Sequence, residues 1–337
     1  MMIKDDLSVG GNILLMLTEF ASKTGLDIEK ARVACNLHKR FLSPPVSRVP
    51  IIPFQSFWRA LEDQSADPSF GIHFTEYSHR LAERDLILVM MLNCSTVGNA
   101  LRLLARYHHY YSDFVQLQID PSESSVALDY IPADVTLRMS HHLEEAMIAA
   151  LILSIRLMSQ GKIKVLETRF RHSKPLNISE HNRVFSSPLR FNQPNSGVSI
   201  KADDFNLPIF LSNQQVLEGV ENLVLDIEES QRKSETIASQ TTRLIQSLLQ
   251  NGQKPSLKDI ATKFHRNDRS LQKLLSAEGT SFRELLNQAR KKVALKYLET
   301  SDMSIGEIAF MLGYDEQSSF HHAFKKWTGQ SPGFYRS

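Results

Sequence analysis

The stretch SIGEIAFMLGYDEQSSFHHAFKKWTG, residues 304–329, decides the fold of the C-terminal part of the chain. Its apolar positions predict two short helices that are joined by a tight Gly-Tyr-Asp turn. On the second helix, Phe320, Phe324 and Trp327 share one side and are expected to pack inward. The opposite side carries Gln, Ser, His and Lys. An outward polar side of this kind needs a functional explanation.

The same layout is repeated upstream in SLKDIATKFHRNDRSLQKLLSAEG, residues 256–279. Ile260 corresponds to Ile308 and Leu271 to Phe320, with offsets of 48 and 49 residues. A Ser-x-x-acid pattern, which satisfies the first amide donors of a helix, begins both units and also the segment between them. The three pairs are Ser256 with Asp259, Ser281 with Glu284, and Ser304 with Glu307. The intervening segment 282–299 is predicted to be a connecting helix about 27 Å long.

Two helices joined by a tight turn, with a polar outer face on the second, form the arrangement that places a recognition helix in the DNA major groove. Arg and Lys suit the guanine edge, and Gln can pair with adenine. The predicted DNA-binding residues are Arg269, Gln272, Lys273 and Ser276 in the first unit, and Gln317, Ser318, His321, His322 and Lys325 in the second. Successive major-groove faces lie ~34 Å apart, and the connecting helix could hold two recognition helices near that separation.

The distribution of charge supports a polyanionic partner for this part of the chain. The net charge is only +2, but residues 1–238 contain 24 basic and 28 acidic residues, whereas residues 239–337 contain 15 and 9. A basic module attached to an acidic remainder is typical of nucleic-acid binding. Charge alone leaves a solvated basic face without a partner as an alternative.

Residues 1–212 are predicted to form a mixed α/β (α+β) domain. Helical periodicity is present in three segments, Gly11 to about Leu61, Thr96–Tyr111 and His141–Gln160. Alternating polar and apolar residues predict strands at 114–119, 125–131 and 163–170. The turn sequence DPSES joins the first two strands into a hairpin.

Residues 213–236 are predicted to be an amphipathic helix followed by a linker. Val216, Val220, Leu223 and Ile227 form one apolar stripe on the helix. The partner of this stripe is either the preceding domain or the same helix in a second subunit. The polar segment Ser234–Thr242 is the predicted linker. Residues 237–337 then form an all-α domain with two helix-turn-helix motifs joined by a long helix.

The C-terminal motifs resemble those of AraC/XylS-type transcription regulators. The shared features of residues 304–336 are an Ile-Ala pair, Leu-Gly-Tyr, Gln-Ser-Ser-Phe, Ala-Phe-Lys, Ser-Pro and Tyr-Arg. NDRSLQKLLSAEGTSFRELL, residues 267–286, matches the first unit of that family. The family usually has Arg where this chain has His322, and a Ser-Pro-Arg start where this chain has Asn267-Asp268-Arg269. A neutral imidazole reaches less far and carries no charge, so His321 and His322 could instead only fill a helix surface.

The N-terminal part resembles, more loosely, the arabinose-binding-type sensor domain of the ornithine-regulator subgroup. The matching segments are 86–113, 166–175 and 189–200. The resemblance implies a homodimeric, cytoplasmic regulator, most often an activator, that binds a small-molecule effector, promoter DNA and RNA polymerase. The sequence contains no signature that identifies the effector or its ligand-binding residues.

Enzymatic and metal-dependent functions find no support in the sequence. No catalytic motif, cofactor motif or membrane-spanning apolar run is present, and Cys35 and Cys94 lack the spacing of a disulfide or zinc site. The pairs His108-His109, His141-His142 and His321-His322 are expected to bind no metal, because adjacent helix positions point about 100° apart. Two alternatives to a regulator remain. One is an alkyl-transfer DNA repair protein, which needs an activated cysteine. The other is an architectural DNA-bending protein, in which the N-terminal domain would have no function.

Overall fold

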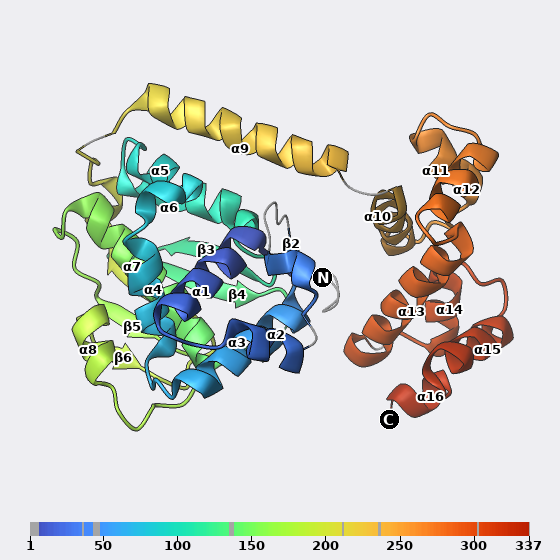
Figure 1. The fold of residues 1–337 in the computed structure, drawn as a ribbon, viewed down its shortest axis with the longest axis horizontal. Helices are drawn as coiled ribbons and strands as arrows, with labels where there is room; N and C mark the ends of the chain where they lie inside the picture. The colour runs from blue at the N-terminus through green and yellow to red at the C-terminus, as the bar shows by residue number, and fades with distance from the viewer. Residues whose placement is uncertain are drawn as a thin grey trace. The chain divides into compact units, whose positions relative to one another are not determined.

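The computed structural model describes residues 7–35, 37–42, 48–134, 138–210, 212–234, 237–301 and 303–336. The chain folds as two compact units, and the boundary between them falls between residues 228 and 229 (Figure 1). Among the described residues, no helix combines the length and the apolarity that crossing a membrane requires. The predicted combination of a mixed α/β unit with an all-α helix-turn-helix unit is confirmed.

The first unit contains a five-stranded sheet in the order β3-β4-β7-β5-β6. The strands are β3 (Val115–Pro121), β4 (Ser125–Pro132), β5 (Glu167–Arg169), β6 (Leu189–Arg190) and β7 (Ser196–Lys201). The predicted hairpin is confirmed, since β3 and β4 pair antiparallel with Gln118 opposite Asp129. A separate small ribbon pairs β1 (Ser8–Gly10) with β2 (Arg48–Pro50).

The strand predicted over 163–170 is wrong in length, because only Glu167–Arg169 pairs as β5. The amide of Ile163 donates to the Ser159 hydroxyl at 3.3 Å instead of to a neighbouring strand. That bond holds the segment against the end of the preceding helix until Leu166 donates to the Ser199 carbonyl at 2.8 Å. The alternation of polar and apolar residues in the sequence therefore begins four residues before the hydrogen-bonded pairing of β5 begins.

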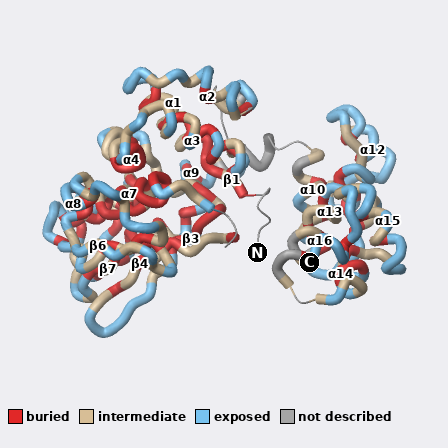
Figure 2. The backbone as a smooth tube through the Cα atoms, turned by 90° about the horizontal axis from the view of Figure 1, so that it is seen from below, coloured by how far each residue is buried: buried red, intermediate tan, exposed pale blue. Residues whose placement is uncertain are grey.

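Helices pack around the sheet and bury most of the first unit's apolar residues (Figures 1 and 2). The α-helices are α1 (Gly11–Lys23), α2 (Ile28–Ala34), α3 (Ile51–Ser65), α4 (Phe70–His79), α5 (Leu86–Leu92), α6 (Val97–Tyr107), α7 (His141–Ser159), α8 (Ser179–Phe185) and α9 (Gln214–Ser234). The short 3-10 helices are η2 (Lys39–Leu42), η3 (Ala82–Arg84), η4 (His108–Tyr110) and η5 (Asp203–Asn206). Most of α7 is buried, as Figure 2 shows.

Helices α4 and α7 cross at close range. A Cβ atom placed on Gly71 would lie 1.8 Å from the backbone carbonyl oxygen of His142. One turn further on, the Thr75 hydroxyl donates to the Ala146 carbonyl at 3.0 Å. On the other side of α4, Phe74 contacts Trp58 edge to face, with ring centroids 5.3 Å apart. The absence of a side chain at Gly71 is what allows the two helices to approach this closely.

The stripe of α9 that packs against the first unit only partly matches the predicted one. The predicted Val220 packs against the core together with Leu217 and the fully buried Val224, whereas the predicted Val216 and Leu223 are 41% and 47% exposed. Both stripes fit the period of a helix, because α9 has apolar residues on two sides. A hydrogen bond favours the stripe that contains Val224, because Tyr107 donates to the Glu221 carboxylate at 2.6 Å.

The second unit consists of α10 (Ile237–Gln250), α11 (Leu257–Lys263), α12 (Asp268–Ala277), α13 (Phe282–Thr300), α14 (Ile305–Met311), α15 (Gln317–Thr328) and α16 (Pro332–Arg336). The predicted linker at 234–242 is therefore wrong from Ile237 onward, where α10 begins; residues 235 and 236 lie outside the described residues. Thr241, Ile245 and Leu249 recur at helical spacing and are fully buried, a stripe that the polar composition of the segment conceals. The Glu278 carboxylate accepts hydrogen bonds from the Ile237 and Ala238 amides at 2.9 and 2.7 Å. A negative charge at this position stabilises the start of α10.

Candidate nucleic-acid interface and candidate ligand cavity

The two repeated helix pairs have the same local construction. Ser256 and Ser304 cap α11 and α14, and Ser304 forms a complete capping box with Glu307. The turns that follow contain left-handed backbone at equivalent positions, His265 with φ 53° and Gly313 with φ 75°. Since only this backbone conformation reverses the chain within so few residues, the turn geometry is duplicated although the residue types differ.

Side-chain packing fixes which faces of α12 and α15 are free. Leu271 and Leu275 of α12 and Phe320 and Phe324 of α15 are fully buried. Figure 1 shows α11 and α12 toward one end of the second unit and α14 and α15 toward the other, with α10 and α13 between them. Helix α13 has 19 residues, which corresponds to about 28 Å.

The residues predicted to contact DNA lie on the outer faces of these two helices. Arg269, Gln272, Lys273 and Ser276 are exposed on α12, and Gln317, Ser318, His322 and Lys325 are exposed on α15. His321 is only half-exposed, and one of its ring nitrogens lies 3.3 Å from the Gln317 side-chain nitrogen. The Ser318 hydroxyl donates to Glu316 at 3.0 Å. The side chains of α12 are thus free to reach a ligand, and part of the α15 set has local partners.

Other cations of the second unit support the fold. The Arg290 guanidinium donates to the Leu312 carbonyl at 2.8 Å and stacks on the Tyr314 ring at 4.4 Å. Lys254 pairs with Asp315 at 3.1 Å, beside the turn that leads into α15. By contrast, neither Arg269 nor Lys273 forms an ion pair with a carboxylate of the described residues.

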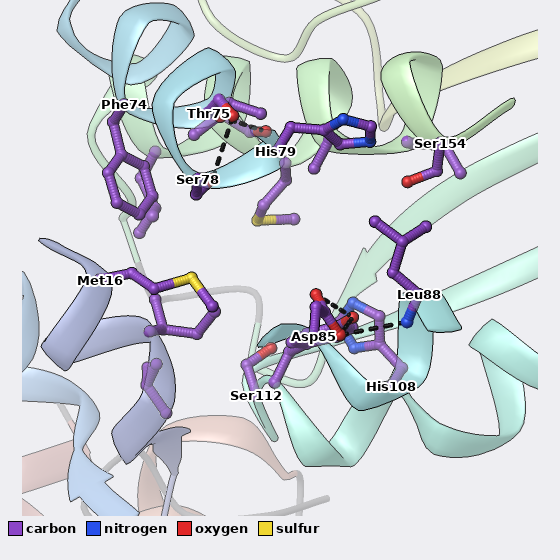
Figure 3. Close-up of a pocket in the computed structure, with 18 of the residues that line it drawn as sticks. Met16, Phe74, Thr75, Ser78, His79, Asp85, Leu88, His108, Ser112 and Ser154 are labelled. Carbon is purple, nitrogen blue, oxygen red and sulfur yellow. Dashed lines mark hydrogen bonds between the residues drawn. The ribbon is translucent and has the colours of Figure 1, made fainter. Parts of the chain in front are cut away.

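The first unit encloses a cavity of about 160 Å³ that the sequence did not predict. Its wall combines residues of β1, α1, α3, α4, α5, α6, η4, β4 and α7 with residues between these elements. Most of the lining is apolar and aromatic, including Met16, Phe54, Trp58, Phe74, Leu88, Phe114 and Leu151. In Figure 3, His79 and Ser154 lie on one side of the cavity and Asp85, His108 and Ser112 on the other.

Asp85 is the one carboxyl group in the cavity wall, and its hydrogen bonds are used within the fold. Tyr111 donates to both carboxylate oxygens at 2.6 and 2.7 Å, and the amides of Ile87 and Leu88 donate to one oxygen at 3.1 Å each. Burial raises the pKa of Asp85, and the hydrogen bonds from these three donors oppose the shift. Asp85 therefore positions α5 and η4 around the cavity.

Two histidines in the wall have free ring nitrogens. Among the described residues, His79 Nε2 and His108 Nδ1 are buried and have no hydrogen-bond partner. Burial lowers the pKa of His79, and it lowers the pKa of His108 to about 4, so both rings are neutral near pH 7. Neutral imidazole can donate or accept one hydrogen bond at each nitrogen, depending on its tautomer. Besides the Ser, Thr and Tyr hydroxyls of the lining, the described part of the wall thus offers two neutral imidazole nitrogens, and it contains no Lys or Arg.

Cys94 lacks the environment of a nucleophile. Cys94 is 3% exposed, and burial raises the pKa of its thiol to about 11. A reactive cysteine instead needs a lowered pKa and an electropositive, accessible setting. The geometry opposes the alkyl-transfer alternative.

Comparison with known proteins identifies both units. Residues 25–209 match the model of the arabinose-binding domain of AraC transcription regulators, and residues 260–337 match a helix-turn-helix domain. The chain is 22% identical over 320 residues to the ornithine utilization regulator of Pseudomonas aeruginosa, covering 95% of this chain and 94% of that protein. It is 40% identical over 81 residues to the transcriptional activator NphR of Rhodococcus sp, covering 24% of each. The crystal structure of the transcriptional regulator CdpR from Pseudomonas aeruginosa has 21% identity and a TM-score of 0.44, over 92% of this chain and 98% of that chain.

The fold and the two matched domains define a DNA-binding transcription regulator with an N-terminal ligand-binding domain. The chain belongs to the AraC family of transcription regulators, because the model of the family's N-terminal domain alone matches more than half of it. The predicted resemblance is confirmed, and the domains and relatives are those of regulators and not of enzymes.

Proposed function

We propose that this chain regulates transcription in response to an uncharged small molecule that binds in the cavity of the first unit. The observation that carries the proposal is the presence, in one chain, of two exposed recognition helices and a largely apolar cavity. A purely architectural DNA-bending protein has no use for such a cavity.

The remaining parts of the proposal concern assembly and the sign of regulation. We propose an effector-binding and dimerisation domain at 1–212, a connecting helix and linker at 213–236 and a DNA-binding domain at 237–337. The exposed side chains of Val216 and Leu223 on α9 support a homodimer contact. Activation, through contact with RNA polymerase, is supported by the similarity to a protein named as a transcriptional activator. The cytoplasm is the proposed location, because the bacterial chromosome is there.

The cavity wall indicates the chemical class of the effector. A cavity of about 150 Å³ lined by Leu, Ile and Phe holds benzene or xenon, and this one is of similar size. An anion has no cation to pair with, and burying an unpaired charge is costly. A free amino acid carries two charges and fits this wall poorly, although one relative is named for ornithine utilization. The proposed effector is a small aromatic or aliphatic molecule with one or two polar atoms directed at His79 and His108.

Filling the cavity is expected to abolish effector binding. Ala150 lines the cavity on α7, and Leu157, on the same helix, is 42% exposed. We expect Ala150→Trp to remove the thermal stabilisation given by active members of a library of uncharged aromatic and aliphatic compounds, and Leu157→Trp to retain it. Stabilisation of the wild-type chain is about 2.7 kcal/mol at a ligand concentration of 100 times Kd. Equal stabilisation of both variants would place the effector elsewhere.

The spacing of the two recognition helices is tested with DNA. Operators are selected from random duplexes with the full chain, and 5 or 10 base pairs are then inserted between the two contacted segments. The 5-base-pair insertion moves one segment to the opposite face of the duplex, and the 10-base-pair insertion keeps the face but adds about one helical turn, ~34 Å, to the separation. Because α13 sets the distance between the two helices, we expect either insertion to reduce binding to that of a single contacted segment in fluorescence anisotropy. Failure to select any preferred sequence at physiological salt contradicts the proposed function.

A further inference from the structure

Several histidines surround one buried carboxylate on α7, the helix that also contributes Leu143 and Ala146 to the cavity wall. Glu145 of α7 is fully buried. Its Oε2 lies 3.0 Å from Nδ1 of His142, and its Oε1 lies 2.7 Å from Nε2 of His181 and 3.7 Å from Nε2 of His172. The cluster joins α7 to the segment after β5 and to α8, which are separated from α7 along the chain. Nothing in the proposed regulatory mechanism uses these groups.

His172 presents a lone pair to the carboxylate. Its Nδ1 lies 2.9 Å from the Ser173 carbonyl oxygen, which can only accept, so the ring proton is on Nδ1. In the neutral ring, Nε2 then has a lone pair, and this atom is buried and has no hydrogen-bond partner among the described residues. It lies 3.7 Å from Glu145 Oε1, a separation at which both atoms can bind one cation. A hydrogen bond from Nδ1–H to a backbone carbonyl is also the usual way in which proteins orient a metal-binding imidazole.

The spacing along α7 suits a metal ion. His141, His142 and Glu145 each offer one donor atom, and these atoms lie within 4.8 Å of one another. Metal-to-nitrogen distances of 2.0–2.1 Å at a tetrahedral ion place neighbouring donors about 3.3 Å apart. The 3.7 Å separation between His172 Nε2 and Glu145 Oε1 is close to that value. His and Glu three positions apart on a helix also bind metals in helix bundles.

The expectation that His141 and His142 cannot share an ion fails on geometry. His141 is the first residue of α7, and its ring centroid lies 3.9 Å from that of His142. The Cβ directions diverge around the helix axis, but the imidazole rings turn back toward each other. His141 is exposed and His142 is 8% exposed, which gives an ion a path from solvent to the buried carboxylate.

The surroundings favour a cation. No Lys or Arg of the described residues forms an ion pair with the buried Glu145 carboxylate. Glu62 and Asp67 add negative potential at His142. A second group of potential donors, at His73, Glu76 and Glu180, is less suited to a cation. The Arg183 guanidinium already forms ion pairs with the carboxylates of Glu76 and Glu180, at 2.7 and 2.5 Å.

We propose that His141, His142, Glu145 and His172 bind a divalent transition-metal ion, with Zn²⁺ as the best match to three imidazoles and one carboxylate. His181 is a positioning residue, which donates from Nε2–H to Oε1 of Glu145, the same oxygen that faces His172. The ion fastens the N-terminal end of α7 to the segment between β5 and α8. Imidazole-rich sites bind several first-row metals, and tetrahedral geometry selects Zn²⁺ among them.

The test uses the full chain after removal of metal by a chelator. Co²⁺ serves as the probe, because a tetrahedral Co²⁺ site absorbs strongly in the visible range, and Zn²⁺ is then added to displace it. We expect one ion per chain, displaced by Zn²⁺. His141→Gln and His172→Gln are each expected to weaken binding at least ~100-fold, the upper end of the effect of losing only an outer partner of a metal ligand. The control is His321→Gln/His322→Gln, which removes an adjacent histidine pair from α15 and is expected to change nothing.

Two results overturn the proposal. One is the absence of Co²⁺ absorption and of Zn²⁺ binding, by calorimetry, at ~1 mM metal. The other is binding that persists at full affinity in both His141→Gln and His172→Gln. His141 is exposed, so its variant folds independently of any effect on the core. Glu145→Gln supplies a further variant, in which the carboxylate charge is lost and hydrogen-bonding atoms remain.

Discussion

Replacing Arg269 and Lys273 together by alanine is expected to weaken operator binding by about 30-fold or more. Each side chain is exposed on α12 and forms no ion pair with the described carboxylates, so each is available to DNA. Loss of one good base or phosphate contact costs ~1–3 kcal/mol, and the two losses add when the contacts are independent. The measurement is anisotropy with a selected operator and a random duplex.

The single variants separate two kinds of contact. If Arg269 contacts a guanine edge, Arg269→Ala relaxes the preference at one base position. If Lys273 contacts a phosphate, Lys273→Ala weakens binding to all sequences and reduces the salt slope by about one. Lys164→Ala, an exposed lysine of the first unit, removes the same charge from the chain and serves as the control. Unchanged affinity in both α12 variants means that another face of the unit binds DNA.

Replacing Gly71 by alanine is expected to destabilise the first unit by about 3 kcal/mol or more. The new Cβ atom would lie 1.8 Å from the His142 carbonyl oxygen and 2.6 Å from its carbonyl carbon. Both obstacles are backbone atoms, so no change of rotamer relieves the overlap, and α4 and α7 have to separate. Separation also lengthens the hydrogen bond from Thr75 to Ala146.

Urea unfolding measures this effect in the first unit alone when Trp58 is the only tryptophan. The chain has two tryptophans, and Trp327→Phe removes the one in the second unit. The control is Gly219→Ala on α9, where no atom lies within 4 Å of the added Cβ. Alanine is favoured over glycine within an exposed helix by about 0.5–1 kcal/mol, so the control variant is expected to be slightly more stable. Equal stability of the two variants contradicts the close approach of α4 and α7.

The recognition units could be predicted from sequence because their determinants are local. Ser304 and Glu307 are three residues apart and form the predicted cap. The packing residues Phe320 and Phe324 are one helical turn apart, and both are fully buried. The duplication of such a pattern at an offset of about 50 residues distinguishes it from an ordinary helix pair. For the same reason, the assignment of the family did not require a three-dimensional structure.

The cavity and the histidine cluster could not be predicted in this way. Asp85 and Tyr111 are in contact although they are 26 residues apart in the sequence, and His172 and Glu145 are neighbours although they are 27 residues apart. Such contacts depend on how several elements pack, which periodicity does not specify. The stripe of α9 was only partly predicted for a related reason, since two stripes fit the helical period and the position of Tyr107 favours one. Thr75 and His79 carried no distinct signal, because α4 also contains His73, Glu76 and Ser78.

The tie between Glu278 and the first amides of α10 has a mechanical consequence. Glu278 directly follows Ala277, the last residue of α12, and its carboxylate holds the first two residues of α10. A displacement of the chain at Ile237 therefore acts on the end of α12 through these hydrogen bonds, and on α13 through its packing against α10.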